Sequence, residues 1–367
     1  MRIGIVCPNF PPATFEGGIA HYSKILVQHL LNRGHEIIAI ASTEFNGASK
    51  KAEISENSKT IRIKGPWNAK SVLEIRRLSI KFNFNCVILQ FSPTLFKKSF
   101  RLMWAITYFP CQKITAFHTL WSNGIDIIFG IACLIGSQKI IATNSEIMKI
   151  LKGRLAFLMK KTYWVPIGSN IMPCYSEAHY QKNDIPLISY FGMLYPGKGL
   201  DLILNVLVKL KQMGLKFDFK FIGGAFLDWE FYVSEFRKKI KRKHLDDCVE
   251  YLGRIEENEV SKWLNLSRFV FLPYKMGLSD RRGSFMAAIS HKKAVLTSPP
   301  ILQMKYFKNG TNVIWPEQQK ISEYVKLSKK MLIDDKLIRR LEEGAKTLSS
   351  NFSWEKIAAR YESVIQN

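Results

Sequence analysis

The segment Leu187-Ile188-Ser189-Tyr190-Phe191-Gly192-Met193-Leu194-Tyr195-Pro196-Gly197-Lys198-Gly199-Leu200-Asp201 places a lone lysine in a glycine-rich turn. The apolar, partly β-branched run before the turn indicates a buried strand, and apolar residues recur at helical spacing over 200–210. Gly197 and Gly199 let the backbone approach a ligand, and the unpaired N–H groups of the helix start could bind an anion together with Lys198. The segment therefore predicts a strand–turn–helix unit with a phosphate site. An ordinary surface turn with a solvated lysine is the alternative.

Strand patterns alternate with helical patterns along the whole chain, which is typical of parallel sheets with crossover helices. In the first half we predict strands at 3–8, 36–41, 86–91, 113–117, 139–143 and 163–167. In the second half we predict strands at 187–193, 217–222, 249–252, 269–273, 294–297 and 311–315. The chain has 367 residues, 47% of them hydrophobic, which suffices for two cores. The sequence predicts two α/β domains, each with a doubly wound parallel sheet.

The domain boundary is predicted where turn formers accumulate and periodicity lapses. Residues 166–173 read Pro-Ile-Gly-Ser-Asn-Ile-Met-Pro, and a polar stretch to Asn183 follows. We therefore expect one domain over 1–170 and a second over 171–350. Residues 351–367 are predicted to form a closing helix that packs back on the first domain, and Asn351-Phe352-Ser353 is its N-cap signal.

The chain is strongly basic, with 54 Lys and Arg against 30 Asp and Glu and a net charge of +24. Such a positive field attracts nucleotides, nucleic acid or anionic lipid. No basic aromatic platform or known nucleic-acid module accompanies the charge, so a nucleic-acid partner is not favoured. The six scattered cysteines form no CxxC pair and are predicted to be buried thiols in a reducing cytoplasm. The amino terminus reads as a strand rather than a signal peptide, and no apolar run reaches the roughly 18 residues of a spanning helix.

Two features of the first half are candidates for ligand contact. Gly17-Gly18 precedes an amphipathic helix, but the loop is not the GxGxxG fingerprint of dinucleotide binding, so a nicotinamide enzyme is disfavoured. A structural turn and a ligand loop are equally supported there. His118 follows the strand 113–117, at the carboxyl end where open α/β sheets bind ligands. A neutral imidazole at that place could orient a sugar hydroxyl, although a lone histidine is more often structural.

The second half contains several candidate anion contacts at predicted strand ends. Arg281 and Arg282 stand before the small-residue helix that begins Gly283-Ser284, where cations oppose the helix dipole unless an anion is bound. Solvated arginines are the alternative. Gly223 and Arg254 also follow strands, so these residues and Lys198 are expected along one sheet edge. No DxD pair is present as a carboxylate seat for a metal.

Taken together, these segments resemble the GT-B glycosyltransferases, and specifically glycosyltransferase family 4. The resemblance spans nearly the whole chain. It is carried by the following stretches: Gly17-Gly18-Ile19, Gly34-His35-Glu36, the strand 86–91, Ala116-Phe117-His118, Pro166-Ile167-Gly168, the turn 192–199 and Phe352-Ser353-Trp354-Glu355.

The resemblance implies two Rossmann-like domains facing a cleft and a retaining, metal-independent hexosyltransferase-type reaction. The first domain would hold a saccharide or lipid-linked acceptor, and the second a nucleotide-sugar donor, with no cofactor. Cations and helix N-termini would neutralise the negative charge of the leaving diphosphate. The implied catalytic residues are His118, Lys198 and Arg282; the implied donor contacts are Gly17, Gly18, Gly192, Gly197, Lys198, Gly223, Arg254, Arg281, Arg282, Gly283 and Ser284.

The sequence departs from the family pattern in three ways. Met193 stands where the family usually has an arginine, and Ser279 and Ala287 stand where it usually has two glutamates. Thr119 follows His118, where the family usually has an acidic or polar group. Arg281 or Arg282 is our candidate for the missing cation. The alternative function is a non-catalytic nucleotide-sugar-binding or scaffolding relative.

A role in surface polysaccharide synthesis on the cytoplasmic side of a membrane is the leading expectation. The apolar segments 100–108 and 127–135 of the basic first half are candidates for peripheral contact with an anionic membrane surface. A solvated basic face is the alternative.

Overall fold

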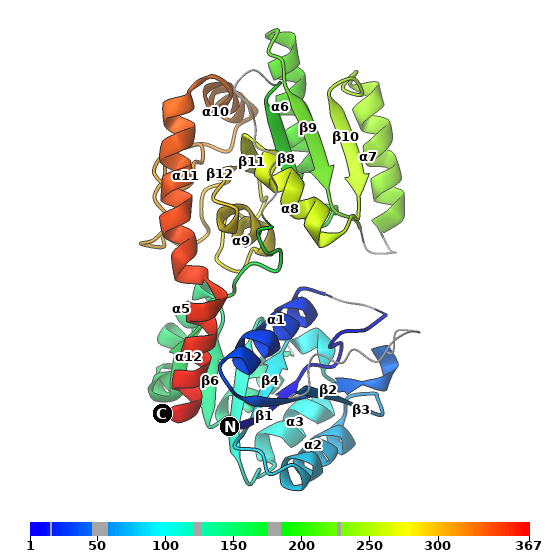
Figure 1. The fold of residues 1–367 in the computed structure, drawn as a ribbon, viewed down its shortest axis with the longest axis vertical. Helices are drawn as coiled ribbons and strands as arrows, with labels where there is room; N and C mark the ends of the chain where they lie inside the picture. Colours follow the sequence, from blue (N-terminus) through cyan, green and yellow to red (C-terminus); the bar gives the residue numbers. More distant parts are fainter. Residues whose placement is uncertain (15–16, 46–57, 121–125, 175–184, 226–228) are drawn as a thin grey trace. The chain divides into compact units, whose positions relative to one another are not determined.

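The computed structural model describes residues 1–14, 17–45, 58–120, 126–174, 185–225 and 229–367. The chain divides into two compact units. Unit 1 comprises Met1–Asn170 together with Trp354–Asn367, and unit 2 comprises Ile171–Ser353. The second unit thus extends to Ser353 rather than to 350, and the last helix is part of unit 1 (Figure 1).

Unit 1 is built on a seven-stranded parallel sheet in the order β3-β2-β1-β4-β5-β6-β7. Its strands are β1 (Arg2–Val6), β2 (Glu36–Ser42), β3 (Ser58–Ile63), β4 (Cys86–Phe91), β5 (Gln112–Phe117), β6 (Lys139–Ala142) and β7 (Thr162–Trp164). Helices cover both faces, so the central strands are apolar on both sides, as buried parallel strands usually are.

The two faces of this sheet carry separate cores. Helices α1 (Gly18–Asn32) and α12 (Trp354–Gln366) cover one face, where Tyr22, Leu26 and Tyr361 pack against the strands. Helices α2 (Ala69–Lys81), α3 (Lys98–Ile106), α4 (Asp126–Gly136) and α5 (Ser145–Arg154) cover the other. The chain's last helix therefore completes the core of the unit that its first residues begin (Figure 1).

Part of the basic excess is used inside unit 1. Lys113 Nζ donates to the carbonyl oxygens of Trp104 at 2.7 Å and Thr107 at 2.9 Å, at the end of α3. Lys161 binds the carbonyl oxygens of Ile135 and Ser137 at the end of α4. Because helix C-termini carry negative partial charge, such lysines are stabilising there. Burial lowers the pKa of Lys113 to about 8. A share of the positive charge thus serves the fold rather than a partner.

Unit 2 contains a five-stranded parallel sheet in the order β10-β9-β8-β11-β12. Its strands are β8 (Leu187–Phe191), β9 (Asp218–Ile222), β10 (Val249–Gly253), β11 (Phe269–Leu272) and β12 (Ala294–Thr297). Its helices are α6 (Leu200–Gln212), α7 (Glu230–Arg242), α8 (Glu257–Leu266), α9 (Gly283–Ser290), α10 (Ile321–Ile333) and α11 (Asp335–Ser349). The predicted fold class, two doubly wound parallel-sheet domains, is confirmed.

Two strand predictions differ from the structure. The predicted strand 311–315 is wrong, because this segment forms only isolated bridges, such as the one from Ile314 to Leu296. Strand β3 (Ser58–Ile63) was not predicted, because it lies at the sheet edge, where half-exposed polar residues interrupt the apolar pattern.

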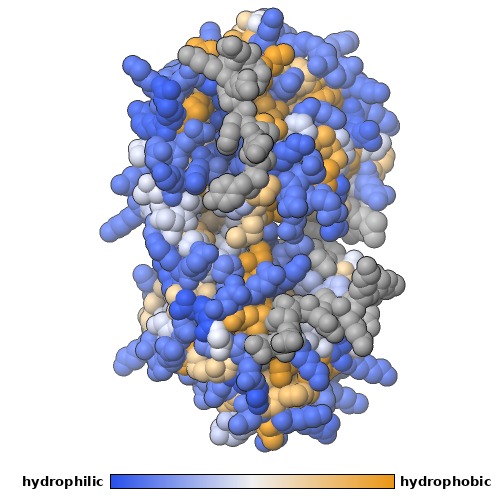
Figure 2. Space-filling view, in the orientation of Figure 1, coloured by the Kyte–Doolittle hydropathy of each residue, from blue (hydrophilic) through white to orange (hydrophobic). Residues whose placement is uncertain are grey.

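The cysteine prediction holds in part. All six cysteines lie within the described residues and are free thiols, but only Cys7, Cys86 and Cys133 are buried, and the other three are half-buried. On the molecular face drawn in Figure 2, polar residues dominate and apolar residues gather in smaller groups between them.

Candidate active site

The glycine-rich turn after β8 has the conformation that its glycines allow. Gly192, Gly197 and Gly199 have φ values of +144°, +104° and +74°, which other residues rarely adopt. A Cβ at Gly199 would also overlap the carbonyl oxygen of Pro273, after β11. The turn that carries Lys198 therefore packs directly on the loop after the neighbouring strand.

Backbone hydrogen bonds join the ends of three adjacent strands. Gly192 N donates to Ile222 O at 2.9 Å, and Gly223 N donates to Gly253 O at 2.9 Å. A Cβ at Gly223 would overlap Gly192 O, so the two loops approach as closely as glycine permits. Arg254 follows β10 beside Gly224. The structure thus brings Gly192, Gly223 and Arg254 to the same sheet edge, as the sequence predicted.

The cations gather where the strand order of unit 2 reverses direction. Strands β8 and β11 are neighbours, whereas β9 and β10 lie on the other side of β8. Open α/β sheets bind ligands at such a switch point, beyond the carboxyl ends of the strands. Lys198 lies in the turn after β8, and Arg281 and Arg282 lie between β11 and α9. The predicted anion contacts therefore flank the switch point from both sides.

Lys198, Arg281 and Arg282 form what we call the cation cluster, and aromatic rings lie beside two of them, Lys198 and Arg282. Lys198 Nζ lies 5.1 Å from the ring centroid of Tyr195 and 5.6 Å from that of Tyr274. The Arg282 guanidinium carbon lies 4.9 Å from the Tyr274 centroid. Both distances to Tyr274 suit cation–π attraction, so its ring contacts both cations. Burial, reinforced by Arg282 and Arg281, lowers the pKa of Lys198 to about 8. A bound anion would relieve this mutual repulsion.

Helix α9 brings further small donors to the cluster. Arg282 is its N-cap residue, and Gly283 and Ser284 form its first turn, whose N–H groups are free of intrahelical partners. Ser284 Oγ lies 2.6 Å from the Tyr274 hydroxyl, and Ser284 adjoins Gly192. Sequence reasoning missed Tyr274 and Tyr195. An aromatic residue directly after a strand, or inside a glycine-rich turn, is the signal that could have found them.

The residues of unit 2 that depart from the family pattern are Met193, Ser279 and Ala287. Ser279 and Ala287 are both buried, and neither side chain carries a carboxylate. The neighbouring Asp280 is also buried, and its carboxylate accepts a hydrogen bond from the Tyr306 hydroxyl at 2.8 Å. Met193 is half-buried, and its carbonyl oxygen accepts a hydrogen bond from the Tyr190 hydroxyl at 3.0 Å.

The remaining predicted site residues lie in unit 1. Gly17 is the N-cap of α1, and Gly18 O accepts a hydrogen bond from Asn170 Nδ2 at 3.1 Å. His118 directly follows β5, with Nε2 2.8 Å from Gln90 Oε1. Helix α1 also places the ring of Tyr22 4.9 Å from the His118 ring. Burial lowers the pKa of His118 to about 3, so its imidazole is neutral at physiological pH.

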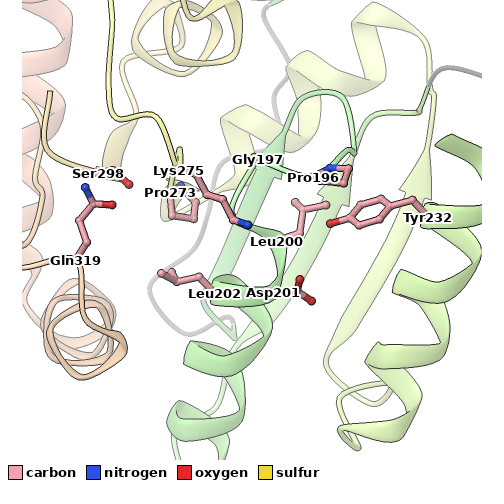
Figure 3. A pocket seen from close by; sticks show the side chains of 11 residues that line it. Pro196, Gly197, Leu200, Asp201, Leu202, Tyr232, Pro273, Lys275, Ser298 and Gln319 are labelled. Atoms are coloured by element: carbon pink, nitrogen blue, oxygen red, sulfur yellow. The ribbon is translucent and has the colours of Figure 1, made fainter. Parts of the chain in front are cut away.

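A small cavity of about 130 Å³ lies beside the Lys198 turn (Figure 3). Pro196, Gly197 and Asp201 line one side of it, and Lys275 and Gln319 line the other. Lys198, Arg281 and Arg282 are not among its lining residues, and we assign no ligand to it. In the described part of the chain, no group of three or more His, Cys, Asp or Glu side chains is placed to hold a metal ion.

Comparison with known proteins places this geometry in context. Residues 175–348 match the family model of the glycosyl transferases group 1. An uncharacterized glycosyltransferase of Methanocaldococcus jannaschii is 24% identical over 260 residues, which is 67% of each chain. A sucrose-phosphate synthase from Thermosynechococcus elongatus superposes with a TM-score of 0.78 at 15% identity, covering 100% of this chain and 98% of that one. Anabaena HepE in complex with UDP-glucose superposes with a TM-score of 0.77 at 13% identity, covering 100% of both chains.

These similarities show that the chain has the GT-B fold. The family model covers most of unit 2, the unit that carries the Lys198 turn and the two arginines. The match to the family model and the GT-B fold together support the assignment of this chain as a glycosyltransferase.

Proposed function

We propose that this protein is a retaining, metal-independent glycosyltransferase that resembles family 4 and moves a hexose from a nucleotide sugar to a saccharide or lipid-linked acceptor. The observation that carries the proposal is the cation cluster of Lys198, Arg281 and Arg282 at the switch point of unit 2. HepE, which has the same fold, was crystallised with UDP-glucose, and this supports a nucleotide sugar as the donor class.

The cluster suits the chemistry of the leaving group. Breaking the bond between the sugar's anomeric carbon and the diphosphate oxygen leaves negative charge on that oxygen. The Lys198 ammonium, the arginine guanidinium groups and the free N–H groups at the starts of α6 and α9 can stabilise this charge as it develops. The acceptor hydroxyl gains the sugar and loses its proton, which the oxygen of the leaving diphosphate can take up. In this proposal unit 1 binds the acceptor, and His118 contacts a sugar hydroxyl as a neutral imidazole.

A screen of nucleotide sugars tests this function. Purified protein with a mixture of saccharide and lipid-linked acceptors is expected to release nucleoside diphosphate from one donor class and to form a glycosylated product. The second candidate, a non-catalytic binder, is favoured by the buried Ser279 and Ala287 at the usual glutamate positions. Tight donor binding by calorimetry without turnover in any acceptor mixture would support that second candidate.

We further propose that unit 1 rests on the cytoplasmic, anionic surface of a membrane during surface polysaccharide synthesis. Within the predicted segments, Phe100 and Trp104 are core residues, but five others are exposed apolar residues on the neighbouring helices α3 and α4 or just beyond the end of α3. These five, called the α3–α4 face, are Leu102, Ile106, Tyr108, Ile128 and Ile135. Lys97 and Lys98 lie exposed at the start of α3, and the acidic residue of α4, Asp126, is buried in an ion pair with Arg101.

Vesicle binding is the measurement that tests this surface. We expect salt-sensitive co-sedimentation with phosphatidylglycerol vesicles and little binding to phosphatidylcholine vesicles. The double variant Ile106→Ser/Ile128→Ser is expected to reduce binding about tenfold or more, because two apolar side chains no longer enter the bilayer surface. The control Phe231→Ser removes an exposed apolar residue of unit 2 and is expected to leave binding unchanged. Salt-insensitive binding, or none, to the anionic vesicles contradicts the proposal.

Among the described residues, the structure contains no helix with the length and apolar character of a membrane span.

A further inference from the structure

The His118 ring makes a hydrogen bond with the buried side-chain amide of Gln90. Its Nε2 atom lies 2.8 Å from Oε1 of Gln90, near the end of β4. Gln90 is 0% exposed. An amide oxygen can only accept a hydrogen bond, so the ring hydrogen lies on Nε2. A neutral imidazole carries one such hydrogen, and Nδ1 therefore keeps its lone pair.

The other described residues in contact with His118 are uncharged. The Tyr22 ring lies edge-on at 4.9 Å, and Asn144 Nδ2 donates to the backbone oxygen of His118 at 3.3 Å. Burial alone accounts for the low pKa, since no charged group among the described residues shifts it. Nδ1 of His118 has no hydrogen-bond partner among the described residues. It is therefore the ring atom that can accept a hydrogen bond from a ligand.

The C-terminal helix α12 brings Tyr361 near Gln90 and Tyr22. The Tyr361 hydroxyl, on α12, accepts a hydrogen bond from Tyr22 at 3.2 Å. Burial raises the pKa of Tyr361 to about 12, and interactions with Tyr22 and Gln90 oppose this rise. Gln90 thus lies between His118 and Tyr361. Its buried Nε2 atom makes no hydrogen bond with a described residue, so among these residues the contact with His118 is the one hydrogen bond of the Gln90 side chain.

We propose that Gln90 is a positioning residue that holds His118 in the Nε2–H tautomer, so that Nδ1 accepts a hydrogen bond from a hydroxyl group of the sugar substrate. The identity of the ligand rests on the proposed function, whereas the tautomer rests on the geometry of unit 1. In this state His118 selects a hydroxyl that donates, and it does not act as a general acid at neutral pH.

The tautomer can be observed directly by ¹⁵N NMR of the full chain with labelled histidine. The His118 signals are assigned by their loss in His118→Asn. In the wild-type protein we expect a protonated Nε2, an unprotonated Nδ1 and no imidazolium down to about pH 5. This measurement needs neither a variant that changes the core nor enzymatic activity.

Two substitutions then test the coupling to Gln90. In Gln90→Glu, a carboxylate at the same place favours the imidazolium, and the titration midpoint of His118 is expected to rise by about 2 pH units or more. The transfer rate should then fall on the acid side of that midpoint, because a protonated Nδ1 cannot accept a hydrogen bond. In Gln90→Leu, the acceptor is lost and both tautomers should be populated. Gln366→Glu makes the same change at an exposed position of α12 and should leave the His118 signals unchanged.

Several results would overturn the inference. A wild-type protein with the hydrogen on Nδ1 rules out the tautomer, and an unchanged His118 titration in folded Gln90→Glu rules out the coupling. A transfer rate that does not follow the new midpoint rules out the hydroxyl contact. Failure of the proposed function is distinguishable, because it would show as no sugar transfer with any donor while the NMR results stand.

Discussion

Replacing Arg282 with alanine is expected to weaken donor binding about 10- to 150-fold, because a charge-assisted hydrogen bond contributes about 1.5–3 kcal/mol and each 1.4 kcal/mol is tenfold in affinity. Arg282 is the N-cap of α9 and lies half-buried against Tyr274, on the opposite side of the switch point from Lys198. Met193 stands where the family usually has an arginine. We propose that Arg282 supplies the positive charge that this arginine would otherwise provide. Calorimetric titration with the donor found in the screen measures the effect.

Matched variants show whether Lys198 and Arg282 both contribute to donor binding. Lys198→Ala is expected to cause a loss of similar size, whereas Arg281→Ala should have a smaller effect, since this side chain is exposed and solvent screens its charge. Arg242→Ala, which removes a largely exposed arginine on α7, is the control and should leave affinity unchanged. The hypothesis fails if Arg281→Ala and Arg282→Ala both preserve donor affinity and turnover while Lys198→Ala abolishes them.

Donor affinity is expected to fall by up to about tenfold per pH unit above about pH 8. Burial and the two neighbouring arginines lower the pKa of Lys198 to about 8 in the ligand-free protein. A bound diphosphate raises this pKa, since opposite charge favours the ammonium. Below pH 8 the lysine is charged in both states, so affinity is constant. Above pH 8 the free lysine is neutral, and binding must take up a proton until the pH exceeds the pKa of the complex.

Calorimetry in two buffers with different ionisation enthalpies measures this proton uptake. At about pH 8.5 we expect between roughly half a proton and one proton per bound donor. Lys198→Arg is the control for the slope, because a guanidinium stays charged throughout this range and its binding should not depend on pH. Wild-type affinity that stays constant from about pH 7 to about pH 9.5 contradicts the prediction.

Much of the fold could be predicted because buried parallel strands leave a local signal. Strands such as β4 and β11 are apolar on both faces, so continuous apolar runs followed by helical spacing mark them. The two errors in strand prediction concern segments at the edges of the two sheets. Strand β3 has a half-exposed, interrupted pattern. The segment 311–315 has an apolar pattern and lies beside β12, but it makes only one isolated bridge to that strand, from Ile314 to Leu296.

The candidate site could be predicted only as far as single turns. The glycines around Lys198 were readable because a positive φ is a local requirement of the backbone. The contacts of Tyr274 and Gln90 were not readable, since nothing in the residues next to them specifies which loop or ring they meet.

For this protein the amino-acid order by itself determined the alternation of strands and helices, the glycine turn of Lys198 and the presence of arginines before a small-residue helix. Only the tertiary structure decided that Lys198 and Arg282 share the ring of Tyr274, and that Gln90 holds His118. The reason is that strands β8 and β11 become neighbours across several intervening elements, as do β4 and β5 across α3. Strand order depends on how whole elements bury their apolar faces together, and that is a property of each assembled sheet rather than of any single segment.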